Sequence, residues 1–128
     1  MNYKVERIKK VLEANLFVEF AYLFGSRARA MATERSDWDI AIYLKKDPRH
    51  LPPWTVFIIE AEISRAIGEE AQLIVLKGID SPVFLFKVIS EGILLIDRNT
   101  ERRILFEASV LRNYHDWKFF LKRQMTMK

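Results

Sequence analysis

Apolar and polar positions along the first third of the chain follow two periods, which predict its secondary structure. Apolar residues at helical spacing predict a helix over residues 3–14. Residues 17–24 (FVEFAYLF) are aromatic and apolar and are stopped by Gly25, as is typical of a buried strand. The Ala/Arg-rich segment 26–31 suggests a short helix, and residues 37–44 (DWDIAIYL) predict a second strand.

The rest of the chain continues this alternation. Ser81 and Pro82 form a helix start signal, with Ser81 as the cap and Pro82 in the first turn. The expected elements are a helix over 54–67 closed by Gly68, a third strand over 71–76, a helix from 82 to Gly92, a fourth strand over 93–96, and a last helix over about 100–122.

Strands that alternate with helices predict an α/β domain in which the helices pack on a central sheet. The alternation leaves open whether that sheet is parallel or mixed. The chain has 128 residues and shows no repeats or linkers, so we expect residues 1–128 to form a single domain.

Composition narrows the class of protein. Half of the residues are hydrophobic and 12% are aromatic, which argues against disorder. The chain has no cysteine, which excludes disulfides and thiolate metal sites. No apolar run reaches membrane-spanning length and the first residues are charged, so we expect a cytoplasmic protein without membrane association.

The net charge of +4 is confined to the end of the chain. Residues 100–128 hold seven Lys/Arg against three Asp/Glu, whereas the charges of residues 1–99 cancel. A basic helix is consistent with nucleic acid or an acidic partner, but also with a plain solvated face. Charge alone therefore does not assign nucleic-acid binding.

Two aspartates lie at the start of the second expected strand. Side chains two residues apart project from the same face of a strand, so Asp37 and Asp39 point together while Trp38 points away. Ionised carboxylates at that spacing repel each other and raise each other's pKa, which a bound cation relieves. Because all the candidate ligands are oxygens, Mg²⁺ is the expected ion.

A Gly-Ser pair closes the strand before these aspartates. Gly25 allows a sharp turn and close approach of a ligand, and a helix starting at Ser26 would offer free N–H groups to an anion. Arg27 and Arg29 follow, with charges suited to phosphate. Each signal alone is weak, but joined in this order against two apolar strands they favour a nucleoside triphosphate with Mg²⁺.

The segment LFGSRARA…RSDWDIAI resembles the signature of the minimal nucleotidyltransferases of the DNA polymerase β-like superfamily. The resemblance implies a small mixed sheet of about four strands flanked by helices, with a long C-terminal helix. It also implies that Gly25 and Ser26, with Arg27 and Arg29, hold the triphosphate of ATP and that Asp37 and Asp39 bind Mg²⁺. Small members of the group are commonly antitoxins that transfer AMP to a tyrosine of a HEPN-domain toxin, or neutralise that toxin by binding.

The chain departs from this family at one important position. The superfamily carries a third carboxylate on a later strand, which acts as the base, and here Gln72 stands in that place. An amide does not accept a proton at neutral pH. Either Glu70 substitutes, provided that the strand already runs through it, or Glu70 is a solvated glutamate and catalysis is impaired.

The last expected helix has apolar residues around nearly its whole circumference, whereas a helix lying on one sheet needs a single apolar stripe. Either its aromatic residues fold over the same core, or the helix contacts a second subunit or a partner protein. Three hypotheses remain: an AMP-transferring antitoxin, a catalytically silent antitoxin that blocks its partner sterically, and a nucleic-acid-binding protein.

Overall fold

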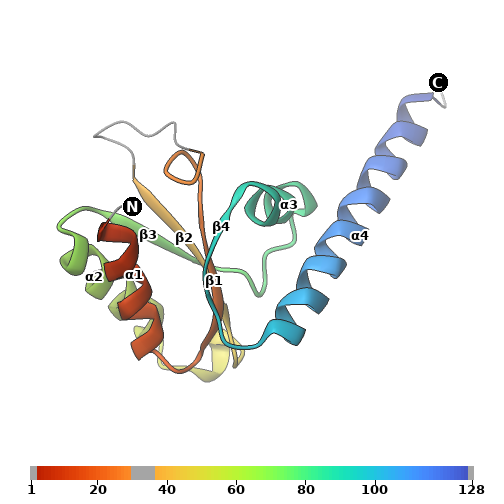
Figure 1. Ribbon diagram of the computed structural model, residues 1–128. Helices are drawn as coiled ribbons and strands as arrows, with labels where there is room; N and C mark the ends of the chain where they lie inside the picture. Colours follow the sequence, from red (N-terminus) through yellow and green to blue (C-terminus); the bar gives the residue numbers. More distant parts are fainter. Residues whose placement is uncertain (1–2, 30–36, 127–128) are drawn as a thin grey trace.

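The computed structural model describes residues 3–29 and 37–126 and contains one four-stranded sheet, in the order β3-β2-β1-β4 (Figure 1). β1 pairs antiparallel with both β2 and β4, whereas β2 and β3 are parallel. The mixed α+β fold expected from the family resemblance is thus confirmed. The strands are β1 (Val18–Phe24), β2 (Trp38–Leu44), β3 (Ala71–Val75) and β4 (Ile93–Asp97).

Helices cover both faces of this sheet. Two of them, α1 and α2, lie against one face, and α3 lies against the other (Figure 1). The first turns of α4 pack on that second face through Phe106, and the helix also contacts α3. The helices are α1 (Tyr3–Ala14), α2 (Thr55–Ile67), α3 (Pro82–Glu91) and α4 (Thr100–Thr126), with a 3-10 turn at Pro48–His50. None of the helices in the described part of the chain is both long and apolar enough to span a membrane.

The two faces are built by alternate residues of the same strands. On β2, Trp38, Ile40 and Ile42 are buried in the cluster that contains residues of α1 and α2. Ala41 and Tyr43, which point the other way, pack in the cluster that includes residues of α3 and α4. A residue's place in this alternation therefore decides which layer it meets.

The helix ends follow the signals read from the sequence. Gly68 ends α2 in the left-handed region at φ +68°, and its N–H donates to the Ser64 carbonyl. The Ser81 hydroxyl accepts from the Phe84 N–H at 3.2 Å and caps α3. Both predictions are confirmed.

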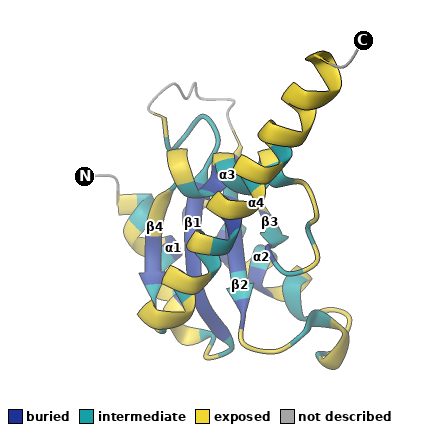
Figure 2. Ribbon diagram, turned by 90° about the vertical axis from the view of Figure 1, so that its right-hand side faces the viewer, coloured by how far each residue is buried: buried dark blue, intermediate teal, exposed yellow. Residues whose placement is uncertain are grey.

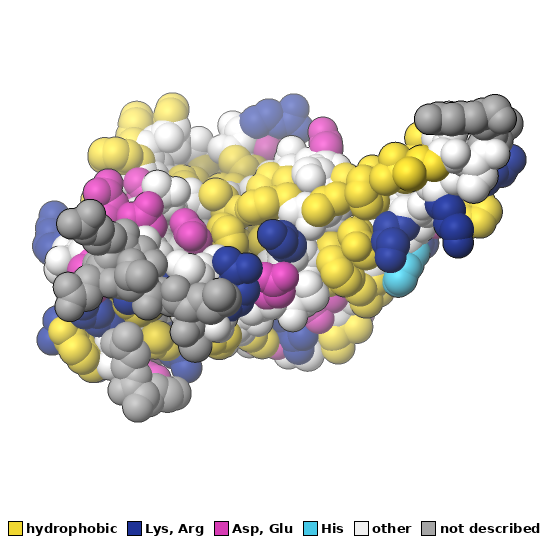
Figure 3. All heavy atoms as spheres, turned by 90° about the horizontal axis from the view of Figure 1, so that it is seen from above, with side chains coloured by type: hydrophobic (Ala, Val, Ile, Leu, Met, Phe, Trp, Pro, Cys, Tyr) yellow, Lys and Arg dark blue, Asp and Glu magenta, His cyan; other side chains and the backbone are white. Residues whose placement is uncertain are grey.

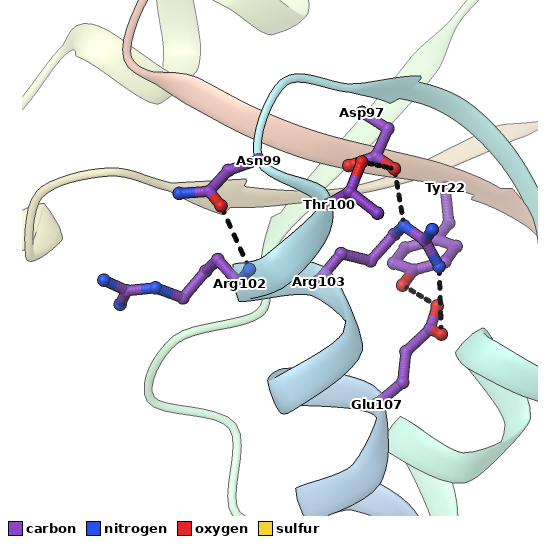
Figure 4. Close-up of polar contacts among 7 residues, drawn as sticks. All are labelled: Tyr22, Asp97, Asn99, Thr100, Arg102, Arg103 and Glu107. Carbon is purple, nitrogen blue, oxygen red and sulfur yellow. Dashed lines mark hydrogen bonds and ion pairs between the residues drawn. The ribbon is translucent and has the colours of Figure 1, made fainter.

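The start of α4 is fixed to the sheet by a polar network (Figure 4). Arg103 Nε donates to Asp97 Oδ2 at 2.8 Å, and its Nη1 donates to Glu107 Oε1 at 3.1 Å. The Tyr22 hydroxyl donates to Glu107 Oε2. Burial, and next the hydrogen bond to Glu107, raise the pKa of Tyr22, so its hydroxyl keeps the proton it donates. The network joins α4 to β1 and β4.

Most element boundaries lie within one residue of the sequence-based expectations, and the following departures are notable. α4 continues to Thr126, four residues past the expected end at 122. Asp37 precedes β2 rather than starting it. The sequence predicts a short helix over 26–31, but residues 26–29 form a turn in which the Gly25 carbonyl accepts the N–H groups of both Ala28 and Arg29. The rest of 26–31 lies outside the described residues.

Candidate functional site

The site begins where β1 ends, at Gly25. The last residue of β1, Phe24, is paired in register with Asp39 on β2, so the turn and that carboxylate lie side by side. Gly25 has φ +77°, and a Cβ built on it would lie 2.6 Å from Asp39 Oδ2. The carboxylate thus occupies the space that any side chain at position 25 would need.

The two aspartates bracket a buried tryptophan. Trp38 is only 2% exposed and joins the core on the α1 and α2 side. Alternation directs Asp39 to the face of α3 and α4, while Asp37 is exposed just before the strand. Burial, and next the charge of Asp37, raise the pKa of Asp39, so the two carboxylates interact.

Asp37 and Asp39 suit a cation whose remaining ligands are phosphate and water oxygens. Among residues 3–29 and 37–126, no three His, Cys, Asp or Glu side chains gather into a group able to hold a metal ion. An ion at Asp37 and Asp39 would be completed by further oxygen ligands, and Mg²⁺ commonly takes these from phosphate and water when it binds with a nucleotide.

The position expected to carry a third carboxylate lies beside this pair. Gln72 is the parallel-strand partner of Asp39, so both side chains project from the same face, and Gln72 is exposed. β3 begins at Ala71, so Glu70 lies outside the strand, although its carbonyl accepts the Trp38 N–H at 3.4 Å. The strand therefore does not run through Glu70, the condition under which that residue would share the face of Gln72.

The two arginines after the turn have different surroundings. The Arg27 guanidinium pairs with Glu69 Oε1 at 3.2 Å and lies 4.6 Å from the centre of the Trp38 ring. Both partners place it on the side of α1 and α2, away from the face of Asp39. Arg29 is exposed, and its Nη1 lies 3.7 Å from Glu91 Oε1 on α3.

A cavity of about 220 Å³ separates the turn from α3. Arg29 and Lys87 bring two cations to it, and Gly25 forms part of its wall. Lys87 has no sequence signal of its own, since it enters the site only because α3 packs over β1. The lining residues are Phe24, Gly25, Arg29, Phe84, Lys87, Val88 and Glu91.

A larger cavity, of about 570 Å³, lies at the other end of β2, beside Tyr43 and the first turns of α4. Its lining residues include neither Asp37 nor Asp39, nor Gly25. The smaller cavity adjoins Gly25, and Arg29, Lys87 and Glu91 bring charged side chains to it. Neither aspartate of the pair lines it, but Asp39 lies beside Gly25 at its edge. Such a site can hold a polyphosphate together with a divalent cation.

The family model described as "Polymerase beta, Nucleotidyltransferase" matches residues 6–101, which include every residue of this site. The chain belongs to this nucleotidyltransferase family. A relative from Methanocaldococcus jannaschii, named "Putative protein adenylyltransferase MJ0128", is 31% identical over 88 residues, covering 69% of this chain and 86% of the relative.

Solved structures show the same nucleotidyltransferase fold. A crystal structure described as a toxin-antitoxin with AMP-PNP superposes with a TM-score of 0.77 at 21% identity, covering 94% of each chain. A second, of a tri-AMPylated Shewanella oneidensis HEPN toxin with an MNT antitoxin, gives a TM-score of 0.71 at 20% identity and covers 96% of this chain and 93% of the other. At these identities the likeness establishes the fold, long C-terminal helix included.

Proposed function

We propose that this nucleotidyltransferase is a Mg²⁺-dependent antitoxin that transfers AMP from ATP to a tyrosine hydroxyl of a HEPN-type partner protein. The observation that supports the proposal is the nearness of Gly25 to the Asp39 carboxylate, which brings the turn proposed to bind phosphate beside the carboxylates proposed to bind the cation. The adenylyltransferase name of the 31% identical relative supports the transfer of AMP.

In this proposal the turn and the cationic residues bind the phosphates, and the carboxylates bind the metal ion. Gly25 and Ser26 would offer the turn to the triphosphate, and Arg29 and Lys87 would balance the charge of the departing pyrophosphate. Asp37 and Asp39 would hold Mg²⁺, which neutralises phosphate charge as it develops. The acceptor oxygen bonds to the α-phosphorus, the bond from that phosphorus to the β-phosphate oxygen breaks, and pyrophosphate leaves.

Position 72 carries no carboxylate that could accept the proton of the acceptor hydroxyl. Gln72 does not accept it at neutral pH, so it passes to water unless the exposed Glu70 takes it. A tyrosine acceptor suits such a site, because a phenol with a pKa of about 10 gives up its proton far more readily than an aliphatic hydroxyl.

The partner would dock on α4. All residues from Lys118 to Thr126 are exposed, and Phe119, Phe120 and Met125 are 64%, 61% and 70% exposed. Hydrophobic side chains follow this helix, with Lys and Arg side chains beside them (Figure 3), and Figure 2 shows exposure along its outer length. A second copy of the chain would bring the same basic helix, so an acidic partner surface fits better.

One experiment tests the proposal directly. Labelled ATP, Mg²⁺ and the product of the adjacent gene are incubated with the protein, and the partner is examined for the added mass of AMP. We expect labelling that needs Mg²⁺ and disappears in Asp39→Ala. Glu62→Ala, which changes an exposed carboxylate on α2, away from both the site and α4, serves as the control and should label normally.

The second candidate function is a silent antitoxin that neutralises its partner by binding alone. The observation that favours it is Gln72 at the strand position beside Asp39. A stable complex with the partner and no labelling would support it. The third, nucleic-acid binding by the basic α4, would show as a complex with DNA or RNA that weakens steeply with salt.

A further inference from the structure

A polar cluster lies behind the site, on the sheet face covered by α1 and α2. Its centre is the carboxylate of Glu69, one residue past the cap of α2. Glu69 Oε1 accepts from Arg27 Nη2 at 3.2 Å, and Oε2 accepts from the Trp38 indole N–H at 3.3 Å and from Lys4 Nζ on α1. The Arg27 guanidinium also stacks on the Trp38 ring, 4.6 Å from its centre.

Two members of this cluster belong to the segments that form the site: one to the Gly25 turn and one to the segment with Asp37 and Asp39. Arg27 follows Gly25 by two residues, within the turn that faces the carboxylate pair. Trp38 lies between Asp37 and Asp39, and its indole points to the opposite face from the Asp39 carboxylate. Glu69 therefore bonds at once to the segment that carries the turn and to the segment that carries the carboxylates.

We propose that Arg27 and Glu69 are positioning residues, which hold the Gly25 turn against Asp39 from the far side of the sheet. This inference rests on the proposed function where it concerns catalysis. Gly25 and Asp39 Oδ2 are already in tight contact, so a shift of either segment alters the space left for a phosphate. Misplacement of a reacting group by about 1 Å costs about 100-fold in rate.

The geometry suits arginine and no other cation. The planar guanidinium stacks on the indole while its fork reaches the carboxylate, and lysine offers a single point charge without the flat face. The hydrogen bond from Lys4, then the one from Trp38 and the charges of Lys4 and Arg27, lower the pKa of Glu69, so its carboxylate remains charged at neutral pH. If Arg27 bound phosphate instead, it would have to leave both partners.

The two roles predict different kinetics. As a positioning residue, Arg27 affects the geometry of bound ATP, so Arg27→Lys and Glu69→Gln should lower kcat for AMP transfer by about 10- to 100-fold with KM for ATP little changed. If Arg27 were a phosphate ligand, Arg27→Lys would instead raise KM for ATP with kcat little changed, because lysine offers a single point charge in place of the bidentate fork. Glu69→Gln would then have no effect.

The test that does not need activity is hydrogen–deuterium exchange of the purified full chain. In Glu69→Gln we expect faster exchange at the Ala28 and Arg29 amides, which bond to the Gly25 carbonyl, and at the Trp38 amide. Glu6→Gln is the matched control: it removes an α1 carboxylate paired with Lys9 at 3.6 Å that touches neither segment, and it should leave this exchange unchanged.

The outcomes separate this inference from the proposed function. If the wild-type protein transfers no AMP, the proposed function fails, while faster exchange confined to these segments still supports the positioning role. Exchange in Glu69→Gln that equals that of Glu6→Gln overturns the positioning role, even where AMP transfer is intact. A rise in KM for ATP in Arg27→Lys at unchanged kcat overturns it as well.

Discussion

Gly25 and Asp39 face each other so closely that no side chain fits between them: a Cβ at position 25 would stand 2.6 Å from Asp39 Oδ2. The contact joins the two motifs of the nucleotidyltransferase signature through space, although 14 positions separate them in the sequence. Glycine is needed at position 25 for two reasons: its backbone adopts φ +77°, and a side chain would collide with the Asp39 carboxylate.

Gly25→Ala therefore has two expected effects. The positive φ costs about 1–2 kcal/mol of stability for a residue with a side chain. The added methyl also pushes the Asp39 carboxylate aside, so AMP transfer should fall by at least about 10-fold. Urea unfolding measures the first effect and the rate of partner labelling measures the second.

Gly78→Ala is the matched control for this substitution. Gly78 has φ +94° and nothing within 4 Å of its built Cβ, so it shares the backbone strain without the contact. We expect similar destabilisation and full activity. Equal losses of activity in the two variants would show that the contact with Asp39 does not matter for catalysis.

Asp39→Asn should raise stability and remove function at the same time. Burial, followed by the charge of Asp37, raises the pKa of Asp39, so the ionised form is disfavoured in the folded metal-free protein. This penalty is present above the raised pKa and is relieved as pH falls through it towards the unfolded value of about 3.9. In EDTA at pH 7 the variant should thus unfold at a higher temperature than the wild type.

The difference in unfolding temperature between Asp39→Asn and the wild type should change sign when Mg²⁺ and ATP are added. A ligand that binds only the folded state stabilises it, so the wild type gains and Asp39→Asn does not. Thermal unfolding between pH 5 and 7, with and without Mg²⁺ and ATP, checks both parts. A variant that gains as much from Mg²⁺ and ATP as the wild type does would remove Asp39 from the metal site.

Gln72→Asp tests whether the missing carboxylate limits the reaction. The side chain is exposed beside Asp39, so a carboxylate there would share the same face without entering the core. If proton removal is slow in the wild type, labelling should rise by about 100-fold, the lower range for a positioned base. Gln72→Asn, which shortens the side chain without adding charge, should leave the rate low.

The opposite result is equally informative. A third carboxylate crowds the pair and raises the pKa of Asp39 further, so without metal the variant should lose stability at pH 7. Labelling that falls in Gln72→Asp would mean that the added charge disturbs a site already competent with glutamine. The silent-antitoxin hypothesis requires no labelling in the wild type.

Much of this fold could be predicted because its signals are local. The alternation of apolar residues fixed the faces of Trp38 and Ile40, and the caps at Gly68 and Ser81 marked helix ends that the structure confirms. The nearness of Gly25 to Asp39 could also be expected, since β1 and β2 are consecutive strands. Their roles in binding phosphate and metal stay predictions.

Contacts between residues that are distant in the sequence could not be predicted from it. Arg27 and Arg29 look alike in the sequence, yet Glu69, 42 positions further on, and Trp38 draw Arg27 to the far face. Lys87 reaches the cavity only because β4 pairs with β1 and brings α3 over it. Local periods do not encode which strands become neighbours.

Substitutions at the exposed end of α4 should weaken partner binding without altering the nucleotide site. Phe119→Glu and Phe120→Glu replace side chains that are 64% and 61% exposed, so folding should be unaffected. If the partner docks there, the double variant should bind it at least about 100-fold more weakly, since central aromatic anchors contribute about 2 kcal/mol or more each. Analytical ultracentrifugation of the mixture measures this.

Leu16→Glu is the control for this surface. Leu16 is 78% exposed in the turn before β1 and lies outside α4, so the same change of charge there should leave the complex intact. ATP binding should persist in both proteins. A complex that survives in Phe119→Glu/Phe120→Glu would move the docking site away from the end of α4.

The network around Arg103 should decide whether α4 stays on the sheet at all. Arg103→Met leaves Asp97 and Glu107 without their shared cation, and Asp97 Oδ1 is already buried with no hydrogen-bond partner among the described residues (Figure 4). Breaking such a partly buried pair costs about 3 kcal/mol of unfolding free energy. Tyr22→Phe, which removes one donor to Glu107, should cost only about 1 kcal/mol.

Arg112→Met provides the comparison on the same helix, because Arg112 is exposed and the change should alter the free energy of unfolding by less than about 0.5 kcal/mol. Urea unfolding of the three variants gives these values. Since α4 would carry the partner while β1 carries the Gly25 turn, a loosened network should also weaken partner labelling more than ATP binding. Equal stability losses in Arg103→Met and Arg112→Met would show that α4 is held by apolar packing alone.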